Sequence, residues 1–121
     1  MDSTTTISTL RSAVDKFVDA RSWYKYHTPK NLAMSIAIEA AELMEHFQWY
    51  EVSESSEIMQ NPEKRAEVAD ELADVLIYAL SLATVTDIDI SEAIFKKLAR
   101  NEQRFPVEVV QGKLLTKKQS K

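Results

Sequence analysis

The scarcity of helix-breaking residues is the feature that most constrains the fold of this sequence. Only one glycine and three prolines occur in 121 residues, and these two residue types most often interrupt regular structure. No segment alternates β-branched and polar residues over a full strand length, and the nearest candidate, Val107-Glu108-Val109-Val110, is short. We therefore predict an all-α chain that consists of long helices with short connections.

Two of the three prolines mark the start of a predicted helix. Thr28-Pro29 and Asn61-Pro62 each combine an N-capping side chain with a proline at the first helical position. Apolar residues at helical spacing predict a helix before them, and Asp89 with Glu92 forms a capping-box pattern for a helix after them. The sequence thus predicts a four-helix-bundle-type architecture with helices at about residues 4–21, 29–49, 62–84 and 90–104.

The composition limits the class of protein. The net charge of −4 argues against a general nucleic-acid binder, so we expect no nucleic-acid polymer as partner. The chain has no cysteine, which excludes disulfides, thiolate zinc sites and cysteine nucleophiles and is compatible with a reducing cytoplasm. No signal-peptide pattern is visible, and no apolar stretch reaches the roughly 18–20 residues that span a bilayer. We expect a cytoplasmic protein without a membrane segment.

Two short acidic pairs, Glu39-Ala-Ala-Glu42 and Glu71-Leu-Ala-Asp74, carry the strongest chemical signal. A spacing of three residues places both carboxylates of a pair on one face of a helix. Each pair adjoins an apolar run, and a buried carboxylate without a partner costs on the order of several kcal/mol. Such a group protonates, pairs with a cation or binds a metal. Few basic residues lie nearby in sequence, so metal binding is the working hypothesis.

Several alternatives apply to this acidic signal. A solvated face is the ordinary explanation of a stripe of like charge such as Glu67, Asp70, Glu71 and Asp74. If a metal binds, oxygen ligands favour Mg²⁺ or Mn²⁺ over zinc or copper. Di-iron bundles use a Glu-x-x-His pair on two helices, which this sequence lacks. With glycine only at position 112, Gly-rich phosphate loops are excluded.

Aromatic and basic residues lie near the predicted helix ends. A group of aromatic residues there is either core or interface, or it holds a flat ring by stacking that is worth about 1–3 kcal/mol per base. His27 either begins a helix or donates a hydrogen bond to a base or phosphate. Lys97 and Arg104 share one side of a helix, and that side is either solvated or holds phosphates. The aromatic group comprises Trp23, Tyr24, Tyr26, Trp49 and Tyr50.

Short motifs surround the acidic pairs over about residues 10–106. They are Phe17-Val18-x-x-Arg21-x-Trp23, His27-x-Pro29-Lys30-Asn31-Leu32, Glu39-Ala40-Ala41-Glu42-Leu43, Phe47-Gln48-Trp49, Glu71-Leu72-Ala73-Asp74-Val75-Leu76-Ile77-Tyr78 and Lys97-x-x-x-Asn101-x-x-Arg104-Phe105-Pro106. Together they resemble the MazG-like all-α nucleoside triphosphate pyrophosphatases, and within them the dCTP pyrophosphatase branch. Phe105 departs from this pattern, since relatives often have tyrosine there.

The resemblance implies an enzyme that uses Mg²⁺, or Mn²⁺ as a substitute, to hydrolyse a nucleoside triphosphate to monophosphate and pyrophosphate. The branch makes dCTP the first candidate substrate, and the implied role is cleaning of the nucleotide pool. It also implies a single MazG-like domain over residues 1–106 and assembly into a homodimer or a dimer-of-dimers homotetramer. The lysine-containing stretch after this domain predicts a loosely ordered tail over residues 107–121.

The same resemblance assigns expected roles to individual residues. The metal ligands and catalytic carboxylates would be Glu39, Glu42, Glu71 and Asp74. One of these four, with Glu42 as one candidate, would orient or deprotonate the attacking water. The base and sugar would lie among Trp23, His27, Trp49 and Tyr78, and the phosphates would contact Lys97, Asn101 and Arg104. The alternatives are a non-catalytic nucleotide- or metal-binding regulatory module and a purely structural dimerisation bundle.

Overall fold

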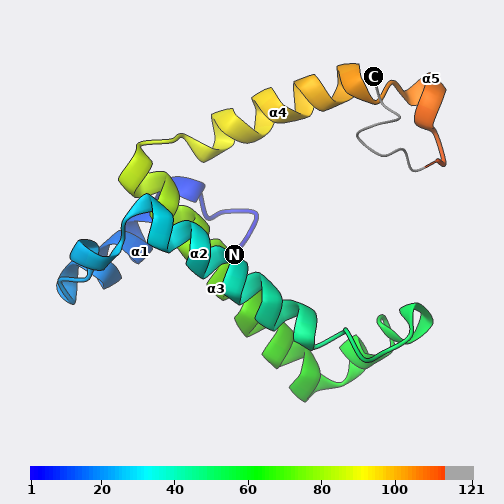
Figure 1. Cartoon of the computed structure of the whole chain (residues 1–121), viewed down its shortest axis with the longest axis horizontal. Coiled ribbons are helices and arrows are strands. Elements are labelled where there is room, and N and C mark those ends of the chain that lie inside the picture. Colours follow the sequence, from blue (N-terminus) through cyan, green and yellow to red (C-terminus); the bar gives the residue numbers. More distant parts are fainter. Residues whose placement is uncertain (114–121) are drawn as a thin grey trace. The chain divides into compact units, whose positions relative to one another are not determined.

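The computed structural model describes residues 1–113, and none of these residues lies in a strand (Figure 1). The all-α prediction is therefore confirmed. Three short 3₁₀ turns, η1 (Tyr24–Tyr26), η2 (Val52–Glu54) and η3 (Ile58–Gln60), lie in the connections. The helices are α1 (Ile7–Ala20), α2 (Pro29–Glu45), α3 (Pro62–Thr86), α4 (Ile90–Arg104) and α5 (Val107–Val110).

Side-chain caps determine where the four long helices begin. Thr6, Thr28, Asn61 and Asp89 each accept a hydrogen bond, of 2.8–3.1 Å, from the backbone N–H three residues further on. Each cap satisfies one of the amide groups that a helix start leaves without a partner. The starts of α2, α3 and α4 agree with the sequence prediction, and α1 begins at Ile7 because Thr6 provides its cap.

The helix ends differ more from the prediction. The helix predicted to end near residue 49 ends at Glu45, because Phe47 N–H bonds to the Met44 carbonyl at 2.9 Å and tightens the turn. The third helix runs two residues beyond its predicted end, to Thr86. Asp87 then ends it in the left-handed region at φ 54°, a conformation that aspartate tolerates better than most side chains.

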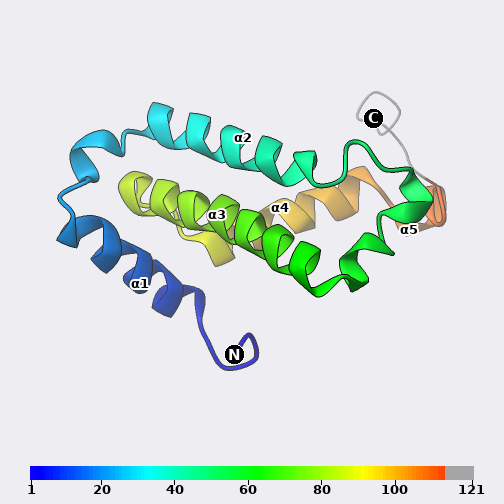
Figure 2. The same cartoon turned by 90° about the horizontal axis from the view of Figure 1, so that it is seen from below.

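The chain divides into two compact units, Met1–Asp87 and a second from Ile88 onward. In the first unit, α3 packs against both α2 and α1. Figure 2 shows α2 and α3 side by side and running in opposite directions. The second unit contains α4 and α5. The proposed boundary at residue 106 stays a prediction: α5 forms one helical turn within the predicted tail, and residues 114–121 lie outside the described residues.

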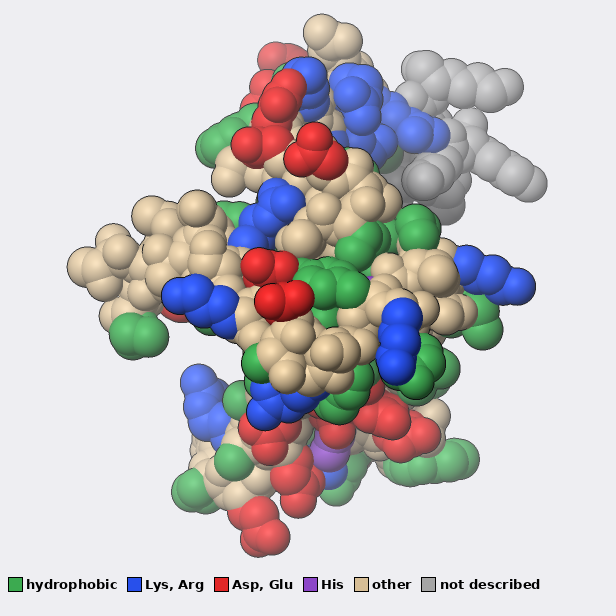
Figure 3. All heavy atoms as spheres, turned by 90° about the vertical axis from the view of Figure 1, so that its left-hand side faces the viewer, with side chains coloured by type: hydrophobic (Ala, Val, Ile, Leu, Met, Phe, Trp, Pro, Cys, Tyr) green, Lys and Arg blue, Asp and Glu red, His purple; other side chains and the backbone are tan. Residues whose placement is uncertain are grey.

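The buried core of the described residues is small. Its apolar members are Val18, Leu32, Val68 and Ala83, so each helix of the first unit contributes. Large apolar side chains remain exposed on the same helices, including Met34 at 53% and Leu76 at 55%, and Figure 3 shows hydrophobic side chains reaching the surface on one face. No helix within residues 1–113 combines the length and the apolar character needed to cross a membrane.

Candidate metal centre and adjoining pocket

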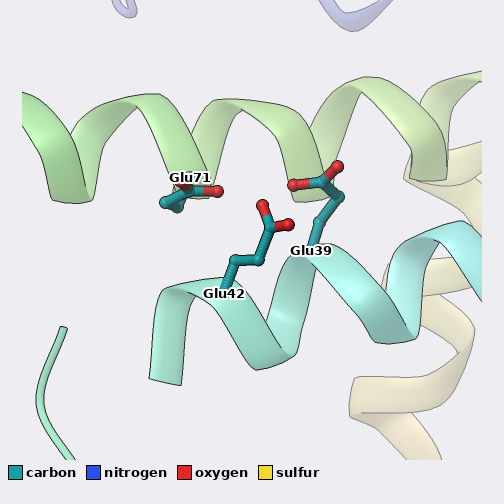
Figure 4. A group of neighbouring side chains, drawn as sticks. All are labelled: Glu39, Glu42 and Glu71. Carbon is teal, nitrogen blue, oxygen red and sulfur yellow. The ribbon is translucent and has the colours of Figure 1, made fainter. Parts of the chain in front are cut away.

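Three of the four predicted metal ligands lie together between α2 and α3. Helix α2 supplies Glu39 and Glu42, helix α3 supplies Glu71, and their carboxylates project into the space between the two helices (Figure 4). One oxygen from each carboxylate lies within 4.8 Å of the other two. The i, i+3 spacing explains why Glu39 and Glu42 share a face, and the antiparallel pairing of the helices brings Glu71 to them.

Asp74, the fourth predicted ligand, lies outside this group of three. It is partly buried and sits about one turn beyond Glu71 on α3. Its negative charge nevertheless acts on both Glu39 and Glu71 and raises the pKa of each. Asp74 therefore lies at the edge of the cluster and adds to its negative electrostatic potential.

Without a cation, burial and the like charges of the cluster disfavour the ionised form of its carboxyl groups. Burial, followed by a hydrogen bond and the charge of Glu42 and then the charges of Asp74 and Glu71, raises the pKa of Glu39 to about 7. Burial, with Glu42 and Asp74 adding to it, also raises the pKa of Glu71, and His46 opposes that rise. At neutral pH these carboxyls therefore share protons or require a positive charge.

The oxygen atoms of the cluster fit a divalent cation. Oε2 of Glu39 and Oε2 of Glu71 are buried, and neither has a hydrogen-bond partner among the described residues. Buried polar atoms are nearly always satisfied, so these two oxygens are available to a bound cation. An all-carboxylate donor set with intermediate burial suits a hard ion such as Mg²⁺ or Mn²⁺.

The contacts between α2 and α3 define a regular series of facing positions. His46 Nδ1 lies 3.7 Å from Glu67 Oε2 on one side of the cluster. On the other side, Ser35 and Tyr78 line the same cavity. The facing pairs along the interface are Ser35 with Tyr78, Glu39 with Asp74, Glu42 with Glu71, and His46 with Glu67.

The cavity at the Ser35 end has a volume of about 250 Å³. It brings together three of the four residues expected around the base and sugar, namely Trp23, His27 and Tyr78. Tyr26, Asn31 and Ser35 line it as well. His27 Nδ1 is buried and has no hydrogen-bond partner among the described residues, so the pocket holds a polar atom available to a ligand.

Contacts within the first unit hold the aromatic wall of this pocket. The Trp23 ring meets the Phe17 ring edge-on with centroids 5.8 Å apart, and the Arg21 guanidinium lies 3.7 Å from the Phe17 centroid. Arg21 Nη1 also donates to the Phe17 carbonyl at 2.9 Å. Tyr24 donates its hydroxyl to Asp15, and burial together with that hydrogen bond raises the pKa of Tyr24 to about 12. These contacts attach η1 to α1.

The remaining predicted site residues lie elsewhere. Trp49 is 86% exposed and does not line the pocket. Lys97, Asn101 and Arg104 lie on α4 in the second unit, and their spacing of four and three residues places them on one side of that helix. Lys97 is exposed, whereas Asn101 and Arg104 are partly buried.

Sequence reasoning missed several residues of the site region. Ser35 lies four residues before Glu39, and that helical spacing was the available signal for its place on the same face. A second cavity, of about 400 Å³, lies at the other end of the α2–α3 interface and was not predicted. It is lined by residues that include Tyr50, Ile58, Lys64 and Glu67.

Comparison with known proteins gives consistent matches. Residues 34–118 match the model of the MazG-like family. The chain is 36% identical over 107 residues to dCTP pyrophosphatase 1 of Rattus norvegicus and 33% identical to the human protein of that name. Each alignment covers 88% of this chain and 63% of the relative, so the chain spans less than two thirds of their length.

A solved structure is also similar. A crystallised pyrophosphatase from Archaeoglobus fulgidus DSM 4304 superposes with a TM-score of 0.77 at 46% sequence identity. The match covers 83% of this chain and 92% of the archaeal chain. The two chains are therefore similar in sequence as well as in fold.

Proposed function

Since the chain belongs to the MazG-like family, we propose that it is a Mg²⁺-dependent hydrolase that converts a nucleoside triphosphate to the monophosphate and pyrophosphate. One observation carries this proposal: three carboxylates with two unsatisfied buried oxygens lie one helical turn from a small aromatic pocket. The names of the rat and human relatives and of the archaeal structure point to the same reaction class.

Glu39, Glu42 and Glu71 are the proposed metal ligands, with Asp74 as the fourth from the edge of the cluster. A bound Mg²⁺ supplies the positive charge that the phosphates and the attacking water need. Mn²⁺ fits the same oxygen donors. Glu42 interacts with both Glu39 and Glu71, so it is the proposed acceptor of the proton that the water loses.

The pocket is the proposed site for the base and sugar. Trp23 offers a ring for stacking, and the buried Nδ1 of His27 offers a polar contact. With the base there, the α-phosphate lies toward the carboxylates, and attack at its phosphorus releases pyrophosphate intact. Two further proposals rest on the family resemblance. The phosphates contact Lys97, Asn101 and Arg104, and the base contacts Trp49.

We propose a pyrimidine deoxynucleotide, with dCTP first, as the substrate. The pocket volume of about 250 Å³ falls below the roughly 300 Å³ at the lower end of small-molecule sites. This volume holds one nucleobase, and the proposed preference for dCTP rests on the names of the relatives that the chain resembles. Hydrolysis of such a nucleotide would serve to clean the nucleotide pool.

We also propose that the protein works as a homodimer or as a dimer of dimers. Within the described residues only four apolar side chains are buried, whereas Ile38 is 56% exposed and Phe95 72% exposed. Apolar area of this kind is worth roughly 25 cal/mol per Å² when it leaves water, so a second copy of the chain is a favourable cover for it.

Incubation of the pure protein with each deoxynucleoside triphosphate and Mg²⁺ tests the proposed reaction. We expect monophosphate and pyrophosphate in equal amounts, and a loss of at least about 100-fold in kcat/KM in Glu71→Gln, because charge neutralisation is the main catalytic contribution. Glu102→Gln is a matched control on exposed surface of α4. Release of orthophosphate alone contradicts the proposal, and tight nucleotide binding without turnover favours the regulatory-module alternative.

A further inference from the structure

Ser35 is a polar residue that lines the pocket between α2 and α3. Its side chain is partly buried and lines the cavity of about 250 Å³ opposite Tyr78. Helical serines and threonines commonly bond to the carbonyl one turn earlier, as Thr84 does to the Leu80 carbonyl at 3.0 Å. For Ser35, the described residues provide no such partner. Its hydroxyl is therefore available to whatever occupies the pocket.

The facing positions along α2 and α3 place Ser35 between the aromatic wall and the carboxylates. Ser35 precedes Glu39 by four residues, and Tyr78 follows Asp74 by four, so this pair lies about 6 Å along the interface from the nearest acidic pair. The other polar and aromatic lining, Trp23 and His27, comes from the segment around η1. In a nucleotide the sugar joins the base to the α-phosphate.

We propose that Ser35 determines specificity at the sugar by hydrogen bonding to its 3′-hydroxyl. This inference rests on the proposed function, in which the base occupies the pocket and the α-phosphate lies at the carboxylates. A deoxynucleotide has the 3′-hydroxyl as its only free sugar hydroxyl, and Ser35 with Tyr78 flanks the position of the sugar from two helices. A nucleotide without that group leaves a partly buried serine hydroxyl unsatisfied and is rejected.

The test compares substrates that differ only at the 3′ position. The proteins are the wild type, Ser35→Ala, and Ser12→Ala as a matched control, since Ser12 is a helical serine exposed on α1. Alanine keeps the helix, because it has the highest helix propensity, and the thermal midpoint checks the fold. The values of kcat/KM are measured with Mg²⁺ for one deoxynucleoside triphosphate and for its 2′,3′-dideoxy analogue. Calorimetry without metal gives Kd values for the two corresponding monophosphates.

We expect the wild type and Ser12→Ala to prefer the deoxynucleotide by about tenfold, the effect of one hydrogen bond. Ser35→Ala should lose that preference. Its kcat/KM should fall for the deoxynucleotide and stay within about twofold of the wild-type value for the dideoxy analogue. An equal loss with both, or no loss with either, overturns the inference.

The metal-free arm separates this inference from the proposed function. One outcome is that the wild type hydrolyses no triphosphate and still binds the deoxy monophosphate more tightly than the dideoxy monophosphate, with this difference lost in Ser35→Ala. In that case only the proposed reaction fails. If hydrolysis occurs and Ser35→Ala keeps the wild-type preference for the deoxynucleotide over its dideoxy analogue, only the role of Ser35 fails. If the wild type neither hydrolyses nor binds these nucleotides, both fail.

Discussion

His46 Nδ1 lies 3.7 Å from Glu67 Oε2, and this contact joins α2 to α3 one turn beyond the carboxylate cluster. The side chain of His46 is 17% exposed and that of Glu67 is 50% exposed. His46 also lowers the pKa of Glu71, against the larger effects of burial and of Glu42 and Asp74. The pair thus stabilises the helix interface and reduces the excess of negative charge at the cluster.

Replacement of His46 by alanine should raise the pKa of Glu71 further. Burial and the charges of Glu42 and Asp74 already raise this pKa, and the charge of His46 opposes that rise. NMR titration of the Glu71 carboxyl carbon in the presence of EDTA compares the pKa in the wild type and in His46→Ala. An unchanged or lower pKa in His46→Ala contradicts the electrostatic role of His46.

The raised pKa of Glu39 predicts an unusual pH dependence of stability without metal. Glu39 keeps its proton up to about pH 7 in the folded protein, against an ordinary value of 4.5. The folded state then binds more protons than the unfolded state between these values, so the free energy of unfolding should fall as pH rises from about 4.5 to 7.

Urea denaturation at several pH values with EDTA measures this dependence. In Glu39→Gln the free energy of unfolding should fall less over the same pH window. Part of the fall should remain, because the pKa of Glu71 is also raised. Saturating Mg²⁺ should raise the stability most at the high-pH end, where the carboxylates are charged. A metal-free stability that rises with pH in both proteins rules out the burial of Glu39 as described.

Trp23 should contribute more to nucleotide binding than its position near a chain connection suggests. Its ring lines the pocket and is held by Phe17 and Arg21. Stacking on an aromatic ring is worth about 1–3 kcal/mol, so Trp23→Ala should raise the Kd for a nucleoside monophosphate by about tenfold or more. Calorimetry measures the change, and Trp23→Phe should recover most of the affinity.

The same site can be followed by fluorescence, because the chain has two tryptophans. In Trp49→Phe, Trp23 is the single tryptophan, and nucleotide binding should quench or shift its emission. An emission that stays constant at saturating nucleotide contradicts a base that stacks on Trp23.

Leu32 should be the most sensitive apolar position of α2. It is 1% exposed, and it lies beneath the pocket where α2 packs on α3. Leu32→Ala should destabilise the protein by about 2–5 kcal/mol, since it removes buried methylene groups and leaves a cavity. Leu72→Ala is the matched control, because Leu72 is 49% exposed on α3. The destabilisation by Leu72→Ala should stay below about half of that by Leu32→Ala. Equal losses in the two variants mean that Leu72 is buried in an assembly.

Local interactions explain what the sequence by itself determined. The starts of α2, α3 and α4 depend on a capping side chain and the residues within one turn of it, as at Thr28-Pro29, Asn61-Pro62 and Asp89. The pairing of Glu39 with Glu42 on one face depends only on helical geometry. The end of α2 had no such signal, since neither glycine nor proline lies between Glu45 and Trp49.

Only the tertiary structure decided how the two acidic pairs meet. The antiparallel register of α2 against α3 places Glu42 beside Glu71 and leaves Asp74 at the edge, and no local pattern encodes that register. The raised pKa of Glu39 and the place of Ser35 opposite Tyr78 follow from the same packing. Burial and the electrostatic effect of a neighbouring charge depend on distance in space, so residues about thirty positions apart in sequence acquire them only when the helices pack.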